Sequence, residues 1–262
     1  MAMPPSRTSY EAPKRYPILN TFVNALSFEE TVTEVERIVA AGVPTQHVVL
    51  NASKVNLMRE DPDLAGIVNA CPLVNADGAS IVWAARELGV PLEERVAGID
   101  LFLRLVEVAA EKGYGIYLLG AREESVLRVC DEFRRKYPNL DIAGFRNGYF
   151  DVADEPGIVS DIAASGADML FLGFSSPRKE YWAHEHLEEL GVPFVMGVGG
   201  SFDVVAGVTS RAPKWMQDHG LEWLYRFVQE PGRLWRRYIV GNVSFVRYVC
   251  KCKNQSKKEV VQ

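Results

Sequence analysis

The chain has 262 residues, of which 48% are apolar, so it can bury the core of one large domain or of one domain with an appendage. This composition excludes an intrinsically disordered protein. The sequence has neither a run of about 18 apolar residues nor a charged-then-apolar signal segment, and we therefore expect a cytoplasmic protein that does not span a bilayer.

Six short apolar segments, most of them followed by glycine, asparagine or aspartate, predict β-strands. They are residues 47–51, 72–75, 115–119, 142–145, 168–172 and 192–196. Between them, apolar residues recur three or four positions apart, as in Ile81, Ala84, Ala85 and Leu88, which indicates amphipathic helices. The alternation predicts an α/β fold with a Rossmann-like, mostly parallel sheet flanked by helices.

The predicted strands end in small or polar residues that suit a ligand site. Parallel strands joined by right-handed crossovers place their carboxyl ends on one edge of the sheet, where open α/β sheets bind ligands. Asn51, Asp77, Gly120, Gly173 and Gly199 are expected to converge there. The carboxylate of Asp77 suits either a general base or a cap on the following helix, and its position alone does not decide between these roles.

Two loops and one arginine supply further groups for a phosphate or a sugar. Residues 197–200, Gly-Val-Gly-Gly, allow a close backbone approach to a diphosphate, or form a tight turn that needs positive φ. The loop at residues 175–180 presents hydroxyls and cations at a helix start, which is either an anion site or a solvated helix end. Arg95 either reaches the same cleft or pairs with a neighbouring acid.

After about residue 206 the alternation stops and a helical pattern rich in arginine and aromatic residues begins, interrupted at Pro231-Gly232. We therefore divide the chain into four segments. They are a flexible leader (1–15), an α/β catalytic core (16–206), a helical C-terminal appendage (207–250) and a flexible basic tail (251–262).

The net charge of −5 hides a basic C-terminal region, because residues 222–262 hold nine lysines and arginines against three carboxylates. Arginine forks bind phosphate, and basic aromatic helices suit an anionic lipid surface, so this region is expected to contact a phosphorylated ligand or a membrane. Nucleic acid is not an expected partner, because the rest of the chain is acidic and has no recognised nucleic-acid module. The four cysteines and four histidines show no metal-ligand spacing, so no metal is expected.

Several motifs occur in order along the chain. They are Leu50-Asn51-Ala52, Asn75-Ala76-Asp77-Gly78, Glu94-Arg95-Val96-Ala97-Gly98, Tyr117-Leu118-Leu119-Gly120, Pro177-Arg178-Lys179-Glu180, Gly197-Val198-Gly199-Gly200-Ser201-Phe202-Asp203 and the series from Arg211 to Tyr238. Together they resemble the WecG/TagA/CpsF family of bacterial glycosyltransferases over roughly residues 45–245.

The resemblance implies an inverting, metal-independent transferase without a cofactor. Such an enzyme moves a sugar from a UDP-sugar to a polyprenyl-diphosphate-linked saccharide in the synthesis of surface polysaccharides. Asp77 would be the base that takes the proton of the acceptor hydroxyl, and Arg226, Arg233 and Arg236 would lie on an appendage that closes over the site. The same appendage would hold the protein at the inner face of the cytoplasmic membrane and take part in a switch between homo-oligomer and monomer.

Besides Asp77 as the catalytic residue, twelve residues are expected to bind substrate. They are Asn51, Arg95, Gly120, Ser176, Lys179, Glu180, Gly199, Gly200, Arg211, Arg226, Arg233 and Arg236. Where many relatives have Pro-Lys-Gln-Glu, this chain has Lys179 in place of the amide, which favours either a donor sugar with a carboxylate or tighter contact with the diphosphate. Val49 stands where some relatives have a hydroxyl, so no role of that hydroxyl is transferred.

Two other functions remain open from the sequence. One is a different UDP-sugar reaction, epimerisation or hydrolysis, in the same nucleotide cleft. The other is a catalytically idle component of a membrane-docked assembly, which would keep the appendage but would not need Asp77.

Overall fold

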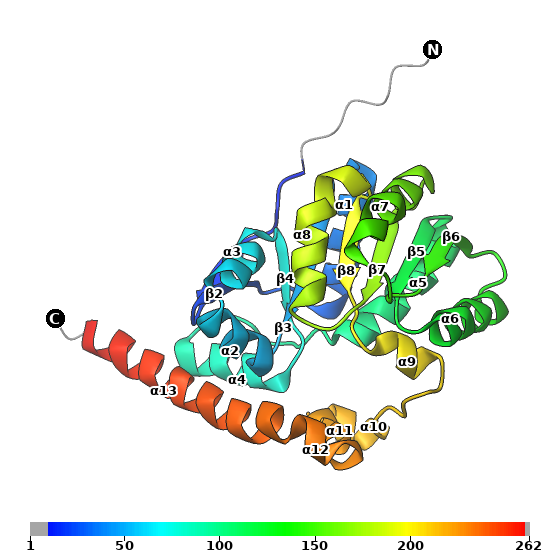
Figure 1. The fold of residues 1–262 in the computed structure, drawn as a ribbon. Helices are drawn as coiled ribbons and strands as arrows, with labels where there is room; N and C mark the ends of the chain where they lie inside the picture. The colour runs from blue at the N-terminus through cyan, green and yellow to red at the C-terminus, as the bar shows by residue number, and fades with distance from the viewer. Residues whose placement is uncertain (1–9, 260–262) are drawn as a thin grey trace.

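The computed structural model describes residues 10–259, apart from the side chains of Asp218, Arg233, Arg237 and residues 256–259. Within this part of the chain, the centre is a six-stranded parallel sheet with helices on both faces (Figure 1). In spatial order the strands are β4 (Leu73–Ala76), β3 (Thr45–Leu50), β8 (Phe194–Gly197), β7 (Met169–Gly173), β5 (Gly115–Gly120) and β6 (Asp141–Arg146). The six predicted strands are therefore present, and their parallel pairing confirms the Rossmann-like α/β fold.

Helices cover both faces of the sheet. One face carries α1 (Phe28–Ala41), α5 (Gly98–Lys112) and α6 (Glu123–Lys136). The other carries α2 (Ala52–Glu60), α3 (Pro62–Ala70), α4 (Ala79–Leu88), α7 (Glu155–Ala164), preceded by a 3-10 turn (Val152–Asp154), and α8 (Arg178–Leu190). Alternation along β5 shows why both faces are apolar: Ile116 and Leu118 pack against the first group, and Tyr117 and Leu119 against the second.

Helix α5 is the element that the core fixes most firmly near the ligand edge. Phe102 is fully buried, and its ring contacts those of Phe133, Phe171 and Phe202 at centroid distances of 5.6, 4.7 and 5.7 Å. The helix ends at Gly113, whose φ of 76° suits glycine. Because α5 begins beside the end of β4, this packing sets the position of the groups at that edge.

An antiparallel hairpin, which the sequence reading did not predict, precedes α1. It consists of β1 (Arg15–Ile18) and β2 (Thr21–Asn24). The Asn24 side chain accepts a hydrogen bond from the Val74 N–H of β4 at 2.7 Å and donates to the carbonyls of Pro13 and Lys14. Residues 1–9, most of the expected leader, lie outside the described residues.

The C-terminal region is helical, as expected, and part of it belongs to the core. After α9 (Ser201–Val205) the chain forms α10 (Lys214–Asp218), α11 (Glu222–Gln229), α12 (Pro231–Trp235), a π-helical turn η2 (Arg236–Val240) and α13 (Gly241–Glu259). Helix α13 lies along α2 and α4 (Figure 1), and its Phe245 and Val249 are buried among their apolar side chains. It passes through residue 250 without a break, so the expected boundary between appendage and tail lies inside a helix.

Candidate active site

Asp77 lies directly after β4, at the carboxyl edge of the sheet. Its N–H donates to the Leu50 carbonyl at 2.8 Å, which ties the end of β4 to the end of β3. Its Oδ1 accepts a hydrogen bond of 2.8 Å from the N–H of Gly98, the first residue of α5. Asp77 therefore caps α5 and not the helix that follows it in sequence, since Gly78 occupies the N-cap of α4. The half-buried carboxylate is held in one orientation and keeps a second oxygen for chemistry.

Asn51 and two glycines surround this carboxylate. A Cβ on Gly78 would lie 3.6 Å from the Asn51 Cβ, and one on Gly98 would lie 3.8 Å from Asp77 Oδ1. The Asn51 side chain accepts a hydrogen bond from the Lys54 N–H at 3.0 Å and so caps α2. The structure thus brings the predicted residues Asn51 and Asp77 together, on the ends of adjacent strands.

Glu180, expected to bind substrate, is instead buried beneath the edge. Its side chain is 2% exposed, and its Oε1 accepts hydrogen bonds from Lys54 Nζ and from Ser176 Oγ. Burial opposes its ionisation, but the nearby charges of Lys54 and Lys179 and these two hydrogen bonds outweigh that effect and lower its pKa. Ser176 and Glu180 therefore fix the loop after β7 to α2.

Lys179 links this loop to the glycine turn after β8. Its Nζ donates to the Gly197 carbonyl at 3.1 Å, and a Cβ on Gly199 would lie 3.8 Å from the same nitrogen. Gly199 has a φ of 57°, as the tight-turn interpretation requires. The N–H groups of Val198 and Gly199 both donate to the Leu172 carbonyl, so these amides point into the sheet and not towards a diphosphate. Gly200 follows at the start of the short helix α9.

Gly120 has a structural reason to be glycine. Its φ is 144°, and a Cβ there would come within 2.5 Å of the Gly173 backbone, so only glycine allows β5 and β7 to meet at this edge. The expected convergence of Gly120 and Gly173 is thus present.

Arg95 and Arg211 form an ionic cluster with Asp100 and Glu222. The Arg211 guanidinium binds both oxygens of Asp100 at 2.6 and 2.8 Å, and its Nε donates to Glu222 at 3.2 Å. Arg95 donates to the other Glu222 oxygen at 3.2 Å and to the Gln217 carbonyl at 2.9 Å. Because Asp100 lies two residues beyond the start of α5, this cluster holds α10 and α11 beside the candidate base.

The remaining predicted arginines lie further along the appendage. Arg226 is exposed on α11, and Arg236 is exposed with its guanidinium 6.0 Å from the Trp235 ring centroid. Among the described side chains, no contact joins either of them to Asp77. The side chain of Arg233 lies outside the described part of the chain.

Sequence reasoning missed three groups at this edge: Lys54, Asp100 and Glu222. Lys54 is 3% exposed, and nothing in the sequence around it indicates that it pairs with Glu180, which lies 126 residues away. Glu222 is one of only three acids in the basic C-terminal region, and this rarity could have marked it as a partner of the arginines. The chain also contains an Asp-x-Asp sequence, but Asp61 there caps α3 and accepts a hydrogen bond from the Tyr181 hydroxyl, away from this edge.

A buried polar network lies under the same edge. His47 Nε2 is 2.9 Å from the Asn75 side-chain oxygen, and the Asn75 amide donates to Thr31. Burial, more than the neighbouring lysines, lowers the His47 pKa to about 4, so the ring is neutral at pH 7 and its Nε2–H donates to Asn75. This network joins β3 and β4 behind Asp77.

An open parallel sheet whose carboxyl edge carries a fixed carboxylate and clustered arginines is the arrangement in which α/β enzymes bind ligands. A family model described as "Glycosyl transferase WecG/TagA/CpsF family" matches residues 16–259. The chain therefore belongs to this family and is a glycosyltransferase.

Two relatives are both named N-acetylglucosaminyldiphosphoundecaprenol N-acetyl-beta-D-mannosaminyltransferase. The protein of Bacillus spizizenii is 32% identical over 199 residues, which cover 76% of each chain. That of Bacillus subtilis is 34% identical over 180 residues, which cover 69% of each chain.

Proposed function

We propose that this enzyme transfers a sugar from a UDP-sugar to a polyprenyl-diphosphate-linked saccharide, with inversion at the anomeric carbon and without a metal ion. The names of the two relatives describe transfer of N-acetylmannosamine to an N-acetylglucosamine carried by a lipid diphosphate. The observation that carries the proposal for this chain is the placement of Asp77, a carboxylate fixed by α5 at the edge where such folds bind nucleotides.

In this mechanism Asp77 acts as the general base. It takes the proton of the acceptor hydroxyl as that oxygen attacks the anomeric carbon of the donor. A new carbon–oxygen bond forms on one face while the bond to the UDP oxygen breaks on the other, so the configuration inverts and UDP leaves with the electron pair. The hydrogen bond from Gly98 leaves the second carboxylate oxygen to receive the proton.

Arginines supply the positive charge that the leaving diphosphate needs. Preorganised cations stabilise charge that develops in a transition state. Glu222 and Asp100 hold Arg95 and Arg211 next to the start of α5, where Gly98 binds Asp77, and the exposed Arg226 and Arg236 lie on α11 and η2. We infer that movement of residues 211–236, which precede the buried part of α13, brings Arg211, Arg226 and Arg236 to the diphosphate beside Arg95, with phosphate oxygens replacing the two carboxylates.

The appendage also provides the surface that meets the lipid-linked acceptor at the membrane. No helix in the described part of the chain is long and apolar enough to cross a bilayer. Large apolar side chains are nevertheless exposed on α10 to α13: Trp215, Leu224, Val228, Trp235, Ile239, Val240, Val243 and Val246. Together with the arginines they form the kind of surface that binds an anionic interface, which supports peripheral attachment to the cytoplasmic face.

The test is Asp77→Asn, which keeps the shape of the side chain and an oxygen for the Gly98 N–H. Mass spectrometry of lipid-linked products formed from a panel of UDP-sugars should show a loss of about 10²- to 10⁴-fold in transfer, with UDP binding retained in calorimetry. Full activity would reject Asp77 as the base. Formation of an epimerised UDP-sugar or a free sugar by the wild type, without a lipid-linked product, would replace transfer with one of the alternative UDP-sugar reactions.

A further inference from the structure

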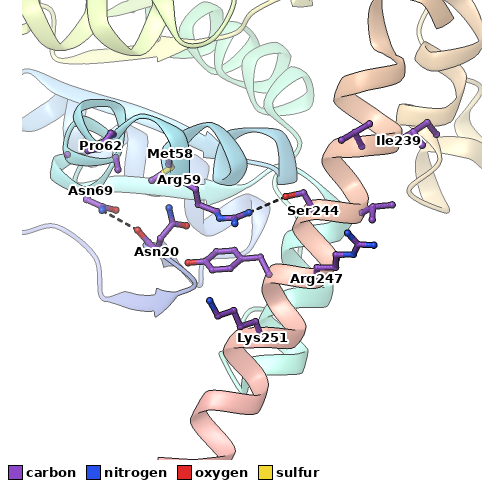
Figure 2. A pocket seen from close by; sticks show the side chains of 14 residues that line it. Asn20, Met58, Arg59, Pro62, Asn69, Ile239, Ser244, Arg247 and Lys251 are labelled. Atoms are coloured by element: carbon purple, nitrogen blue, oxygen red, sulfur yellow. Dashed lines mark hydrogen bonds between the residues drawn. The ribbon is translucent and has the colours of Figure 1, made fainter.

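A groove of about 1080 Å³ lies between α13 and the α2–α3 pair (Figure 2). We call it the flank groove. It is lined by Asn20, Met58, Arg59, Pro62, Ala65, Gly66, Asn69, Ile239, Val240, Val243, Ser244, Arg247, Tyr248 and Lys251. Asn51 caps the start of α2 while Arg59 lies near its end, so about 12 Å of helix separates the groove from the sheet edge.

The charged side chains that line the flank groove are all cationic. Arg59, Arg247 and Lys251 are all exposed, and none of the fourteen described residues that line the groove carries a carboxylate. The Arg59 guanidinium is held in place, since it lies 4.3 Å from the Tyr248 ring centroid and donates to Ser244 Oγ at 3.2 Å. Three cations facing one space without an acid favour an anionic occupant.

Apolar and cationic residues are separated along the groove. Ile239, Val240 and Val243 are 46%, 52% and 48% exposed at one end, and Arg247 and Lys251 follow one and two turns later on α13. Figure 2 shows Ile239 and Lys251 at opposite ends of this stretch. The twelve residue-to-residue steps from Ile239 to Lys251 span about 18 Å, close to the roughly 15 Å depth of hydrocarbon in one leaflet of a bilayer.

An occupant that matches this pattern carries a hydrocarbon chain and a phosphate. We propose that the flank groove binds one anionic membrane phospholipid, with its phosphate among Arg59, Arg247 and Lys251 and an acyl chain along residues 239–243. The inference rests on the membrane attachment in the proposed function and adds a specific lipid site to it. The lipid would fix the orientation of the appendage at the membrane surface.

Gly66 offers a way to fill the groove without changing its charge. It is exposed in α3, and no atom lies within 4 Å of a Cβ added there, so a side chain can be added at this position of the groove lining without a clash at Cβ. We expect Gly66→Phe to remove a one-lipid adduct with phosphatidylglycerol in native mass spectrometry of the full chain. It should also lower binding to vesicles of phosphatidylcholine with phosphatidylglycerol about tenfold, with Gly66→Ala as the matched control.

A second pair of variants tests the charge. The double variant Arg247→Gln/Lys251→Gln should also lose the lipid adduct and bind vesicles about tenfold more weakly. The double variant Arg128→Gln/Arg134→Gln makes the same charge change on exposed residues of α6 and should keep both properties. An unchanged adduct in Gly66→Phe would overturn the proposal. So would equal loss in both charge pairs, displacement of the lipid by millimolar inorganic phosphate, or a wild-type oligomer that Gly66→Phe dissociates in sedimentation.

Failure of this inference is distinguishable from failure of the proposed function. Transfer to a soluble, short-chain acceptor is measured in the same preparations and should be unchanged in Gly66→Phe. Intact transfer without a lipid adduct would reject the lipid site alone, and a lipid adduct without wild-type transfer would reject the proposed reaction alone.

Discussion

Lys179 illustrates how one residue connects two loops of the site. Its Nζ donates to the Gly197 carbonyl at 3.1 Å, and the adjacent Gly197 leaves room for the lysine stem, because a Cβ there would lie 2.5 Å from Lys179 Cδ. The ammonium therefore lies at the glycine turn, where we expect it to contact either a diphosphate or a carboxylate of the donor sugar.

The substitution Lys179→Gln tests these two roles. If the ammonium binds a sugar carboxylate, we expect turnover of uronic UDP-sugars to fall about tenfold relative to neutral ones, the worth of one charge-assisted hydrogen bond. The measurement is kcat/KM for both donor types with wild type and variant. A uniform fall for all donors would assign Lys179 to the diphosphate, and an unchanged ratio would reject the carboxylate role.

His47 makes the stability of the protein depend on pH. Its folded pKa of about 4 is below the ordinary value of 6.5, so the unfolded state binds more protons between these values and stability falls as the pH drops. From pH 7.5 to pH 5 this single group should cost about 2 kcal/mol. Glu180 does not add to this change between pH 7.5 and pH 5. Its pKa is lowered in the folded protein, so the stability that it contributes is lost only at more acidic pH.

Urea unfolding of the wild type from pH 7.5 to pH 5 measures this slope. His47→Gln should flatten it, while His184→Gln, which removes an exposed histidine on α8, should leave it as it is. Equal slopes in the wild type and His47→Gln would contradict the assignment.

At the scale of elements, α13 is part of the core and not a detachable helix. Phe245 is 1% exposed and packs with residues of α2 and α4, whereas the adjacent Val246 is 44% exposed. We expect Phe245→Ala to lower the free energy of unfolding by about 3–5 kcal/mol because it leaves a cavity. Val246→Ala should change it by less than about 0.5 kcal/mol. Chemical denaturation of both variants checks the difference, and equal costs would mean that α13 does not pack as described.

The sequence predicted the elements whose pattern can be recognised from their own residues alone. Strands such as β5 and β7 are apolar at every position because both faces are covered, and that run is visible without any partner. The hairpin was missed because its strands, Arg-Tyr-Pro-Ile and Thr-Phe-Val-Asn, contain no continuous apolar run. Its anchor, the bond between Asn24 and Val74, joins residues 50 positions apart.

The same distinction holds for the site. The positions of Asp77 and Gly199 followed from strand ends and turn geometry, which are local. Which helix Asp77 caps depends on α5, which begins 21 residues later, and the partner of Arg95 lies 127 residues away. Such pairings arise from tertiary packing. The sequence alone therefore predicted neither the ionic cluster around Arg95 and Arg211 nor the burial of Glu180.

For the molecule as a whole, attachment to the membrane should matter only when the acceptor is in the membrane. Trp235 is 48% exposed on the appendage, and Tyr149 is 72% exposed on the loop after β6. We expect Trp235→Gln to reduce transfer to a vesicle-borne acceptor about tenfold, since burying this side chain contributes roughly 1.5–3 kcal/mol to attachment. Tyr149→Gln should have no effect.

Assays of these two variants with a soluble, short-chain acceptor complete the test. Trp235→Gln should match the wild type there. A similar loss with both acceptors would place Trp235 in the active site rather than at the membrane surface.

The side chain of Asn24 also has a consequence for how copies of this enzyme behave when crowded at a surface. Strand β4 borders the sheet, and its Val74 N–H would otherwise be open to pairing with a strand from another molecule. The Asn24 oxygen satisfies that donor, so an amide supplied within the same chain occupies a position at which another strand would pair. If the enzyme gathers on a membrane as we propose, this contact works against stacking into fibres at this position of the border.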